Sequence, residues 1–244
     1  MNHPEQSSMN SPDISAQKPE SIQGMFDRIS SKYDMANTVL SLGTHWLWKK
    51  KLVARSDVKP GGQVLDCACG TGDIAQLFKD RVGEQGRVVA TDFSDGMLRE
   101  ARKRHQKSAI RFEWADVQKL PYADSEFDCA SISFGIRNVA DPAQGLREMA
   151  RVVRPGGRVL VLEFGQPVSK IFRNLYGFYS DRILPTVGGW LSGEREAYRY
   201  LQTSSAKFPC GEQFIELARS TGLFSRCSYE SLTGGIAFLY VLER

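Results

Sequence analysis

Apolar runs rich in β-branched residues recur along the first two thirds of the chain, and segments with helical character separate them. The runs occupy residues 63–68, 87–93, 110–116, 127–134 and 158–164. The helical segments occupy residues 72–81, 95–107 and 142–153. This alternation is typical of a parallel sheet with helices on both of its faces. We therefore expect an α/β domain.

Two further apolar runs differ from the others in how they are connected. Residues 227–232 and 236–242 are joined only by Thr233, Gly234 and Gly235, and a helical segment at 210–221 precedes them. A parallel crossover needs about a dozen residues or more, so this link permits only an antiparallel hairpin. The sequence thus predicts a seven-stranded, mostly parallel sheet with one antiparallel strand near its edge.

The chain outside these runs predicts three further parts. Residues 1–20 are polar and rich in Pro and Ser, which predicts a disordered tail without a signal peptide. Residues 21–54 look helical and are expected to form an N-terminal substrate cap, followed by the main domain at 55–244. Residues 165–205 interrupt the alternation, and an insertion beside a sheet often forms a lid over the substrate.

Composition narrows the class of protein. The 244 residues are 41% hydrophobic and 25% charged, as in soluble globular proteins. The net charge of +4 is too small to indicate a nucleic-acid partner, and no run approaches the roughly 18 apolar residues of a membrane-spanning helix. The five cysteines favour buried thiols in a cytoplasmic protein. Cys67 and Cys69 lack a second ligand pair, so we expect no metal site.

A glycine loop follows the first strand. Residues 70–75 read Gly-Thr-Gly-Asp-Ile-Ala, and Asp92 follows about twenty residues later, which by spacing alone fits a dinucleotide fingerprint. A pyrophosphate binds at a helix N-terminus, and the acidic Asp66 and Asp73 at this corner disfavour it. A cationic cofactor without phosphate, S-adenosylmethionine, fits better. A nicotinamide-dependent dehydrogenase remains the alternative.

The acidic residues of this region have different interpretations. Asp73 is equally well explained as an acid that complements the dipole of its helix. Asp66 lies at the end of an apolar strand, where a carboxylate is usually paired or functional. Asp92 is placed to accept the two ribose hydroxyls of the cofactor, and Asp116 is placed to meet the adenine amino group.

The stretch 131–141, SISFGIRNVAD, follows the fourth strand. A turn that caps the next helix explains Gly135 and Asp141, but it gives Arg137 no task. In open α/β sheets ligands bind beyond the carboxyl ends of the strands. We therefore expect Gly135 to bring the backbone close to the cofactor, and Arg137 and Asn138 to face the substrate.

Several longer stretches resemble one family. They are residues 25–50 (with Tyr33, Asp34, Asn37, Ser41, Gly43, His45 and Trp48), ISFGIRNVAD, RVVRPGGRVLVLEFGQP, AYRYL and LTGGIA. From about residue 24 to 241 the chain resembles the class I S-adenosylmethionine-dependent methyltransferases, and more narrowly the ubiquinone/menaquinone biosynthesis C-methyltransferase family. Trp46, where that family commonly has a basic residue, and Gly165, where it commonly has Ser, depart from its pattern.

The resemblance implies a Rossmann-like fold, S-adenosylmethionine as cofactor and ring C-methylation of a prenylated quinol. That reaction converts demethylmenaquinol to menaquinol and, in some members, also methylates a ubiquinol precursor. A non-catalytic protein of the same fold is disfavoured by the intact motifs. The sequence shows no basic-aromatic platform for RNA, so we expect no nucleic-acid partner, and homo-oligomerisation stays open. The expected cofactor contacts are Asp66, Gly70, Thr71, Gly72, Asp92, Asp116, Val117 and Ser133.

Methyl transfer to carbon requires an electron-rich ring. A phenolic hydroxyl has a pKa of about 10, and a nearby cation lowers such a pKa by roughly 1–3 units. Arg137 is the expected cation, with Asn138 as a hydrogen-bond partner of a ring oxygen. His45 and Tyr33 are candidates for the general base, with Asp34 as a further one. A helix start or packing is the better explanation of His45, and Tyr33 is better explained as a wall of the pocket.

The segment 45–55, HWLWKKKLVAR, places two tryptophans beside three lysines. Aromatic and basic residues together suit a bilayer surface, which a greasy substrate tail favours. The alternative is a helix that packs Leu47, Trp48 and Leu52 on the core and leaves its lysines in water. For this segment alone the packing alternative is the better explanation, and we expect at most loose contact with the membrane.

Overall fold

The computed structural model describes residues 43–167 and 203–244. The predicted tail at 1–20 and most of the predicted cap at 21–54 lie outside the described residues, as does residue range 168–202 of the predicted lid. The last part of the cap segment forms helix α3 (Thr44–Arg55).

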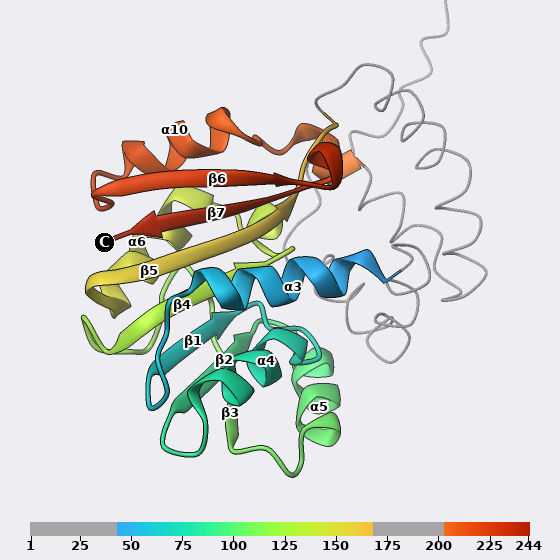
Figure 1. The fold of residues 1–244 in the computed structure, drawn as a ribbon, viewed down its shortest axis with the longest axis vertical. Coiled ribbons are helices and arrows are strands. Elements are labelled where there is room, and N and C mark those ends of the chain that lie inside the picture. Colours follow the sequence, from blue (N-terminus) through green and yellow to red (C-terminus); the bar gives the residue numbers. More distant parts are fainter. Residues whose placement is uncertain (1–42, 168–202) are drawn as a thin grey trace, which may run out of the picture.

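A seven-stranded sheet in the order β3-β2-β1-β4-β5-β7-β6 forms the centre of the fold (Figure 1). The strands are β1 (Gln63–Cys67), β2 (Arg87–Asp92), β3 (Ile110–Trp114), β4 (Phe127–Ser133), β5 (Val153–Phe164), β6 (Arg226–Leu232) and β7 (Ala237–Glu243). Strands β1 to β5 pair in parallel, and β7 is antiparallel to both of its neighbours. The predicted mostly parallel sheet and its antiparallel strand next to the edge are confirmed.

Helices cover both faces of the sheet. They are α3, α4 (Asp73–Val82) and α5 (Asp95–Arg104) on one face, and α6 (Pro142–Val152) and α10 (Glu212–Ser220) on the other. Local signals set where two of them begin. Ser94 caps α5 by accepting from the Met97 N–H at 3.1 Å. Asp141 caps α6 by accepting from the Gln144 N–H at 3.0 Å, with Pro142 as the first helical residue.

Strand β5 is longer than the sequence predicts. We expect a Pro-Gly-Gly turn before a strand at 158–164, yet β5 begins at Val153 and includes the turn residues. The end of the chain explains this difference. The N–H of Gly156 donates to the Arg244 carbonyl at 3.0 Å, and the N–H of Arg244 donates to the Gly157 carbonyl at 3.1 Å. This pairing continues β5 through the turn residues, with Gly156 at a positive φ of 79°. The register of β4 against β5 shifts beside them, between Phe127 and Cys129.

The sheet divides the core into two apolar clusters, one under α6 and α10 and one under α3, α4 and α5. Among the described residues, two carboxylates are almost completely buried in this apolar interior. Asp66 in β1 and Glu163 in β5 are each 1% exposed. A buried carboxylate costs free energy unless it is paired. Asp66 and Glu163 therefore indicate a functional site at the carboxyl ends of the central strands.

Candidate functional site

Buried polar atoms without hydrogen-bond partners within the described residues gather at the carboxyl ends of β1 and β4. Among them are Oδ2 of Asp66, Oγ of Ser133 and Nε of Arg137. The two strands are neighbours, but the helices that follow them pack on opposite faces of the sheet. Such a switch point is where open α/β sheets bind ligands. Unpaired buried polar atoms at that place indicate a polar ligand.

Asp66 is the central acid of the site. Its Oδ1 accepts a hydrogen bond of 2.6 Å from the Ser131 hydroxyl. Burial raises the pKa of this carboxyl to about 7, while the Ser131 hydrogen bond and the charge of Lys49 act to lower it. A cation beside Asp66 favours the ionised carboxylate. The group is therefore suited to bind a cationic ligand at neutral pH.

The glycine loop is held in place by Asp92. Its Oδ2 accepts from the N–H of Gly70 and its Oδ1 from the N–H of Ser94, each at 2.8 Å. Gly70 and Gly72 adopt positive φ angles of 56° and 89°, which glycine reaches without strain. Asp92 thus fixes the glycine loop from the carboxyl end of β2.

Asp73 is not the free negative charge that our sequence argument against a dinucleotide assumed. Its carboxylate is 8% exposed and pairs with Nζ of Lys49 at 2.7 Å and with Nη1 of Arg104 at 3.3 Å. That part of the argument is wrong, because α3 and α5 each bring a cation to the start of α4. The acidic character of this corner depends on Asp66.

The loop residue Thr71 is buried and attached to α5. Its hydroxyl accepts from Nη1 of Arg104 at 3.3 Å, and its carbonyl lies 3.1 Å from Nε2 of His105. The side chain of Thr71 thus holds the loop against a helix. Its backbone follows Gly70 at the carboxyl end of β1, as a loop that lines a cofactor must.

Asp116 and Val117 follow β3 rather than end it. Asp116 lies two residues beyond Trp114, and its Oδ1 accepts from the backbone N–H of Gln118 at 2.9 Å. Both residues are half-buried, and Val117 packs against the core beneath α6. They lie at the same edge of the sheet as Asp92, because the carboxyl ends of the parallel strands β2 and β3 meet there.

The turn after β4 differs from the expectation for Gly135. Phe134 carries the positive φ of 55°, whereas Gly135 has an ordinary φ of −117°. A Cβ on Gly135 would lie 2.6 Å from Cβ of Ala68, in the loop after β1. Glycine is required because the two loops touch each other. The expected close approach of this turn to a cofactor stays a prediction.

Arg137 has a partner that sequence reasoning missed. Its Nη1 donates to Oε1 of Glu163 at 2.5 Å and to the Phe134 carbonyl at 2.6 Å, and both charged side chains are 1% exposed. The signal for Glu163 was present as one acidic residue in the apolar run RVLVLEF. Asn138 lies in the same short 3₁₀ helix, η2 (Ile136–Asn138), where its N–H donates to the Gly135 carbonyl at 3.0 Å.

Of the two main candidates for the general base, His45 and Tyr33, only His45 lies among the described residues. His45 lies in the first turn of α3 and is 5% exposed, with its ring centroid 5.4 Å from that of Trp46. Tyr33 lies outside the described residues, as does Asp34.

Helix α3 only partly matches its expected packing. Trp48 and Leu52 are buried, and Nε1 of Trp48 donates to the Thr233 hydroxyl at 3.0 Å. Leu47 does not pack on the core, because it is 67% exposed. Lys49 does not lie free in water either, since its ammonium group pairs with Asp73 at 2.7 Å and lies 5.0 Å from the centroid of the Trp46 ring.

Gly165, which departs from the family pattern, is packed against β7. A Cβ at this position would lie 2.3 Å from Cε2 of Phe238 and 3.1 Å from Cβ of Cys210. The ring of Phe238 thus occupies the space that a serine side chain would need. The departure is a packing feature and touches none of the predicted cofactor residues.

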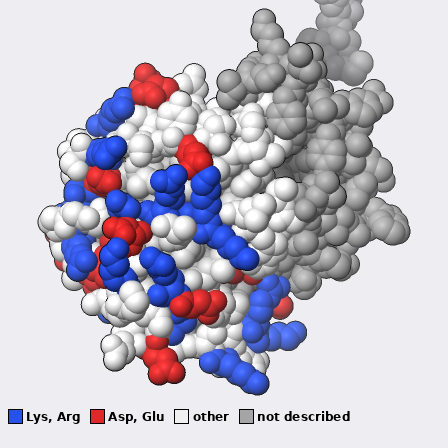
Figure 2. All heavy atoms as spheres, viewed as in Figure 1, with Lys and Arg blue, Asp and Glu red and all other residues white. Residues whose placement is uncertain are grey.

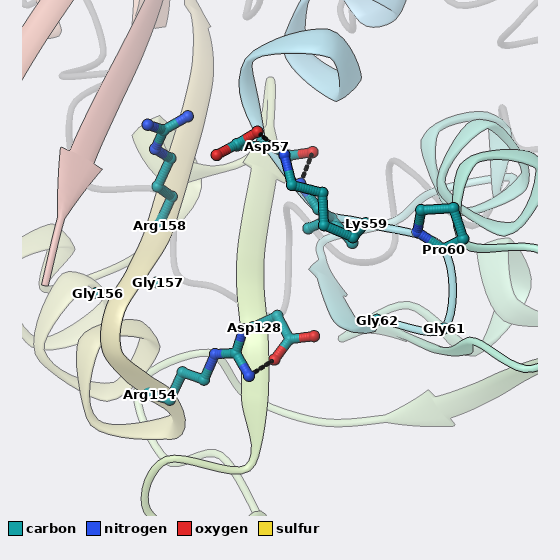
Figure 3. A pocket seen from close by; sticks show the side chains of 12 residues that line it. Asp57, Lys59, Pro60, Gly61, Gly62, Asp128, Arg154, Gly156, Gly157 and Arg158 are labelled. Carbon is teal, nitrogen blue, oxygen red and sulfur yellow. Dashed lines mark hydrogen bonds and ion pairs between the residues drawn. The ribbon is translucent and has the colours of Figure 1, made fainter.

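A separate pocket opens at the opposite, amino-terminal edge of the sheet (Figure 3). Its volume is about 390 Å³. Four of its charged groups pair with one another, Lys59 with Asp57 at 2.5 Å and Arg154 with Asp128 at 2.8 Å, whereas Arg158 pairs with Glu243 outside the pocket at 3.2 Å. None of the predicted site residues lines it. The pocket lies away from the switch point and is not part of the candidate site.

The described residues also bear on metal binding and membranes. Among them, no group of three or more His, Cys, Asp or Glu side chains is arranged to hold a metal ion. In the same part of the chain, no helix is both long enough and apolar enough to cross a membrane. Burial raises the pKa of the thiols of Cys67, Cys69 and Cys129, so these cysteines are poor nucleophiles and ligands.

Comparisons with known proteins agree with this geometry. The profile of the ubiE/COQ5 methyltransferase family matches residues 14–242. The ubiquinone/menaquinone biosynthesis C-methyltransferase UbiE of Bdellovibrio bacteriovorus is 54% identical over 224 residues, which cover 91% of this chain and 95% of that protein. The protein of the same name from Teredinibacter turnerae is 40% identical over 229 residues, which cover 92% of each chain.

A solved structure supports the fold independently. A SAM-dependent methyltransferase from Thermotoga maritima superposes with a TM-score of 0.63 at 19% sequence identity, over 91% of this chain and 99% of that one. At this identity the similarity concerns the fold alone. The expected Rossmann-like methyltransferase architecture is confirmed.

Proposed function

Since the chain belongs to the ubiE/COQ5 methyltransferase family, we propose that it methylates a ring carbon of a prenylated quinol in quinone biosynthesis, with S-adenosylmethionine as methyl donor. Demethylmenaquinol is the proposed substrate, and a ubiquinol precursor is the second candidate. The observation that carries this proposal is the 54% identity, over 91% of the chain, with a protein named for that reaction. The buried polar atoms at the switch point support a binding site for cofactor and substrate there.

The residues at the carboxyl end of β1 fit S-adenosylmethionine. Asp66 has a buried oxygen without a partner among the described residues, and its carboxyl has a pKa of about 7. Both features suit the ammonium of a methionine moiety, which would stabilise the ionised carboxylate. Ser133 offers a buried hydroxyl at the end of the neighbouring strand. When bound, the cofactor supplies an electrophilic methyl group on a positively charged sulfur.

The adenosine half is assigned to the loops after β1, β2 and β3. The loop residues Gly70, Thr71 and Gly72 supply a close-packed backbone. Asp92 would accept the ribose hydroxyls at the carboxyl end of β2, where it also holds the Gly70 and Ser94 N–H groups. Asp116 and Val117, beyond β3, would bind the adenine edge and cover its face.

The methyl acceptor is assigned to the loop after β4. Arg137 has a buried Nε without a partner in the described part of the chain. A guanidinium stays charged and donates directionally, so this N–H would hold the ring oxygen as it gains negative charge. Asn138 would donate to a second ring oxygen. Alignment of ring and methyl group supplies much of the rate in such transfers.

The proton of the ring hydroxyl needs an acceptor. His45 lies at the start of α3, about one turn before Lys49, and Lys49 pairs with Asp73 at the start of α4. This pair holds the beginning of α3 near the carboxyl edge of the sheet. We assign His45 and Tyr33 as the candidates for this general base. A histidine matches the task because its ordinary pKa is about 6.5, near the working pH.

A greasy quinol tail also calls for access to a membrane surface. Figure 2 shows many Lys and Arg side chains, with Asp and Glu among them, on the face that carries α3. Trp46 is 36% exposed and Leu47 is 67% exposed at the start of this helix, and Lys50 is exposed beside them. Exposed aromatic, aliphatic and basic residues together favour a lipid surface. We propose loose, reversible membrane contact through this end of α3.

The decisive experiment incubates the full-length protein with labelled S-adenosylmethionine and a panel of demethylated quinols. Mass spectrometry of the products then identifies which ring is methylated and on which atom. Methylation of demethylmenaquinol alone would assign the protein to menaquinone biosynthesis. Methylation of the ubiquinol precursor as well would assign it to both menaquinone and ubiquinone biosynthesis. Methylation of no quinol, by protein that binds the cofactor, would overturn the proposal.

A further inference from the structure

Both charged side chains of the Arg137–Glu163 pair are almost completely buried. Each is 1% exposed, with Arg137 in η2 and Glu163 near the end of β5. Burying two charges costs free energy that their attraction often does not return, and an apolar pair of similar volume frequently stabilises a fold as well. Packing alone therefore does not account for this pair.

Glu163 holds Arg137 at two points. Its Oε1 accepts the 2.5 Å bond from Nη1 of the guanidinium, and its Oε2 accepts a 3.4 Å bond from the backbone N–H of Arg137. The same Oε1 also accepts from the N–H of Phe164 at 2.8 Å, which ties the carboxylate to its own strand. Glu163 thereby fixes the η2 backbone and the side chain that this turn carries.

These contacts use Nη1 and leave Nε as a buried donor without a partner among the described residues. Nη1 is shared between Glu163 and the Phe134 carbonyl, whereas Nε is buried and has no hydrogen-bond partner among the residues that the structure describes. The guanidinium carbon lies 5.5 Å from the ring centroid of Phe164. Because a guanidinium is rigid and planar, holding Nη1 also sets the direction of Nε.

We infer that Glu163 is a positioning residue for the methyl-acceptor ring, because it aims Nε of Arg137 at the ring oxygen. This inference rests on the proposed function, since it requires Arg137 to contact the ring. Glu163 itself touches neither ring nor cofactor and acts through Arg137. The pair carries no net charge, so it acts through the direction of its donors rather than through a bare positive charge.

Charge and direction predict opposite effects of removing the carboxylate. If charge decided the rate, an unopposed Arg137 would stabilise the ring oxyanion more strongly, and kcat would rise. If direction decides it, the guanidinium loses the contact that orients it, and kcat falls. The sign of the change in kcat therefore separates the two explanations.

The test compares Glu163→Gln with Glu148→Gln in the full-length protein, with S-adenosylmethionine and a demethylated quinol that the wild type methylates. Glu148 is a matched control, because it accepts the Leu120 N–H at 2.9 Å and pairs with Arg151 at 2.8 Å. Glu163→Gln should lower kcat by about 100-fold, as a misplaced catalytic group does. The KM for the quinol and the Kd for the cofactor should change by less than about threefold. Glu148→Gln should leave kcat unchanged.

Two further variants keep the inference testable if Glu163→Gln fails to fold in a thermal unfolding assay. Glu163→Asp keeps the charge but shortens the side chain by one methylene, so kcat should again fall. In an Arg137→Ala background, removing the Glu163 carboxylate should cause no further loss, because residues that act together are not additive.

Each contrary result points to a different error. A kcat at or above the wild-type value in Glu163→Gln and Glu163→Asp would overturn the inference and leave the proposed function intact. Full activity of Arg137→Ala would contradict the role of Arg137, and with it the inference. A wild type that binds the cofactor but methylates no quinol would contradict the proposed function itself.

Discussion

The Ser131 hydroxyl donates a hydrogen bond of 2.6 Å to Oδ1 of Asp66, and both side chains are buried. The bond joins β4 to β1 at the switch point of the sheet. It leaves Oδ2 of Asp66 without a partner within the described residues, and burial raises the pKa of the carboxyl to about 7. A carboxyl group in this state responds strongly to any cation placed beside it.

Affinity for S-adenosylmethionine should therefore rise as the pH increases through about 7. Below this pKa the ammonium must displace a proton from Asp66, so the affinity changes by at most about tenfold per pH unit. Asp66→Asn should flatten this dependence. Above the pKa it should weaken binding by roughly 10–100-fold, as expected for a charge-assisted hydrogen bond. Isothermal titration calorimetry across neutral pH measures both effects.

The stability of the ligand-free protein should follow the opposite trend. Because the folded-state pKa of Asp66 lies above its ordinary value, the folded protein holds a proton that the unfolded chain releases. The contribution of Asp66 is present at low pH and is lost as the pH rises from 3.8 to about 7. Denaturant titrations should show this loss for the wild type and not for Asp66→Asn, with exposed Asp80→Asn as control. If the affinity of the wild type for S-adenosylmethionine did not change with pH, the assignment of the cofactor's ammonium to Asp66 would be contradicted.

Asp92→Asn should weaken cofactor binding by about tenfold or more, because it removes the charge that strengthens hydrogen bonds to the ribose hydroxyls. The amide oxygen still accepts from one of the two backbone N–H groups that the carboxylate holds, so the loop is disturbed less than by alanine. Ser94→Ala is the control, since it removes the cap of α5 beside Asp92 and should cost about 1 kcal/mol of stability without changing affinity. Equal affinity of wild type and Asp92→Asn would exclude the ribose contact.

Lys49 connects α3 to the glycine loop through Asp73. Lys49→Met should lower the free energy of unfolding by roughly 1–3 kcal/mol, because Asp73 keeps only its longer contact with Arg104. The charge of Lys49 also lowers the pKa of Asp66, so the pH midpoint of cofactor binding should move upward in this variant. Exposed Lys50→Met is the control. An unchanged midpoint would show that the field of Lys49 does not reach Asp66.

Vesicle sedimentation tests the proposed membrane contact. Binding should increase with anionic lipid and decrease with salt, because surface charges are screened within about 10 Å at moderate ionic strength. Leu47→Ser should weaken it, whereas Leu223→Ser should not, although Leu223 is also exposed, at 43%. Full activity on a long-chain quinol without sedimentation at any salt concentration would mean that the substrate arrives by another route.

The order of strands and helices was predictable because its signals are local. β-branched runs, glycine loops and caps such as Asp141 depend on a few neighbouring residues, and a link of three residues leaves a hairpin as the only connection. The location of the candidate site was inferred from the same order, since ligands bind at the carboxyl ends of such strands, and it stays a prediction.

The contacts of individual site residues were not predictable, because they join distant parts of the chain. Trp48 meets Thr233 across 185 residues, and Arg137 meets Glu163 across 26. In the sequence Lys49 is one lysine in a run of three, and only the packing of α3 on α4 gives it a partner. The pattern around Gly135 likewise indicated a close approach but not that Ala68 is the group approached.

Arg137→Ala is the strongest test of the proposed chemistry. It should lower kcat by roughly 10²–10³-fold, the effect of losing one oriented donor to a developing oxyanion. Affinity for S-adenosylmethionine should change only a few-fold, because the proposed contact of Arg137 is with the methyl-acceptor ring and not with the cofactor. Arg137→Lys should recover only part of the rate, since a point charge cannot reproduce the planar guanidinium.

The buried partner of Arg137 adds a second effect that the measurement must separate. Arg137→Ala leaves Glu163 buried without its cation, which should lower the free energy of unfolding by about 3–5 kcal/mol. Turnover is therefore compared at a temperature where both proteins are folded, with saturating cofactor. Normal turnover at saturation, combined with a collapse of cofactor affinity, would mean that Arg137 supports the fold or the cofactor. The ring oxygen would then need another donor, with Asn138 as the remaining candidate in this turn.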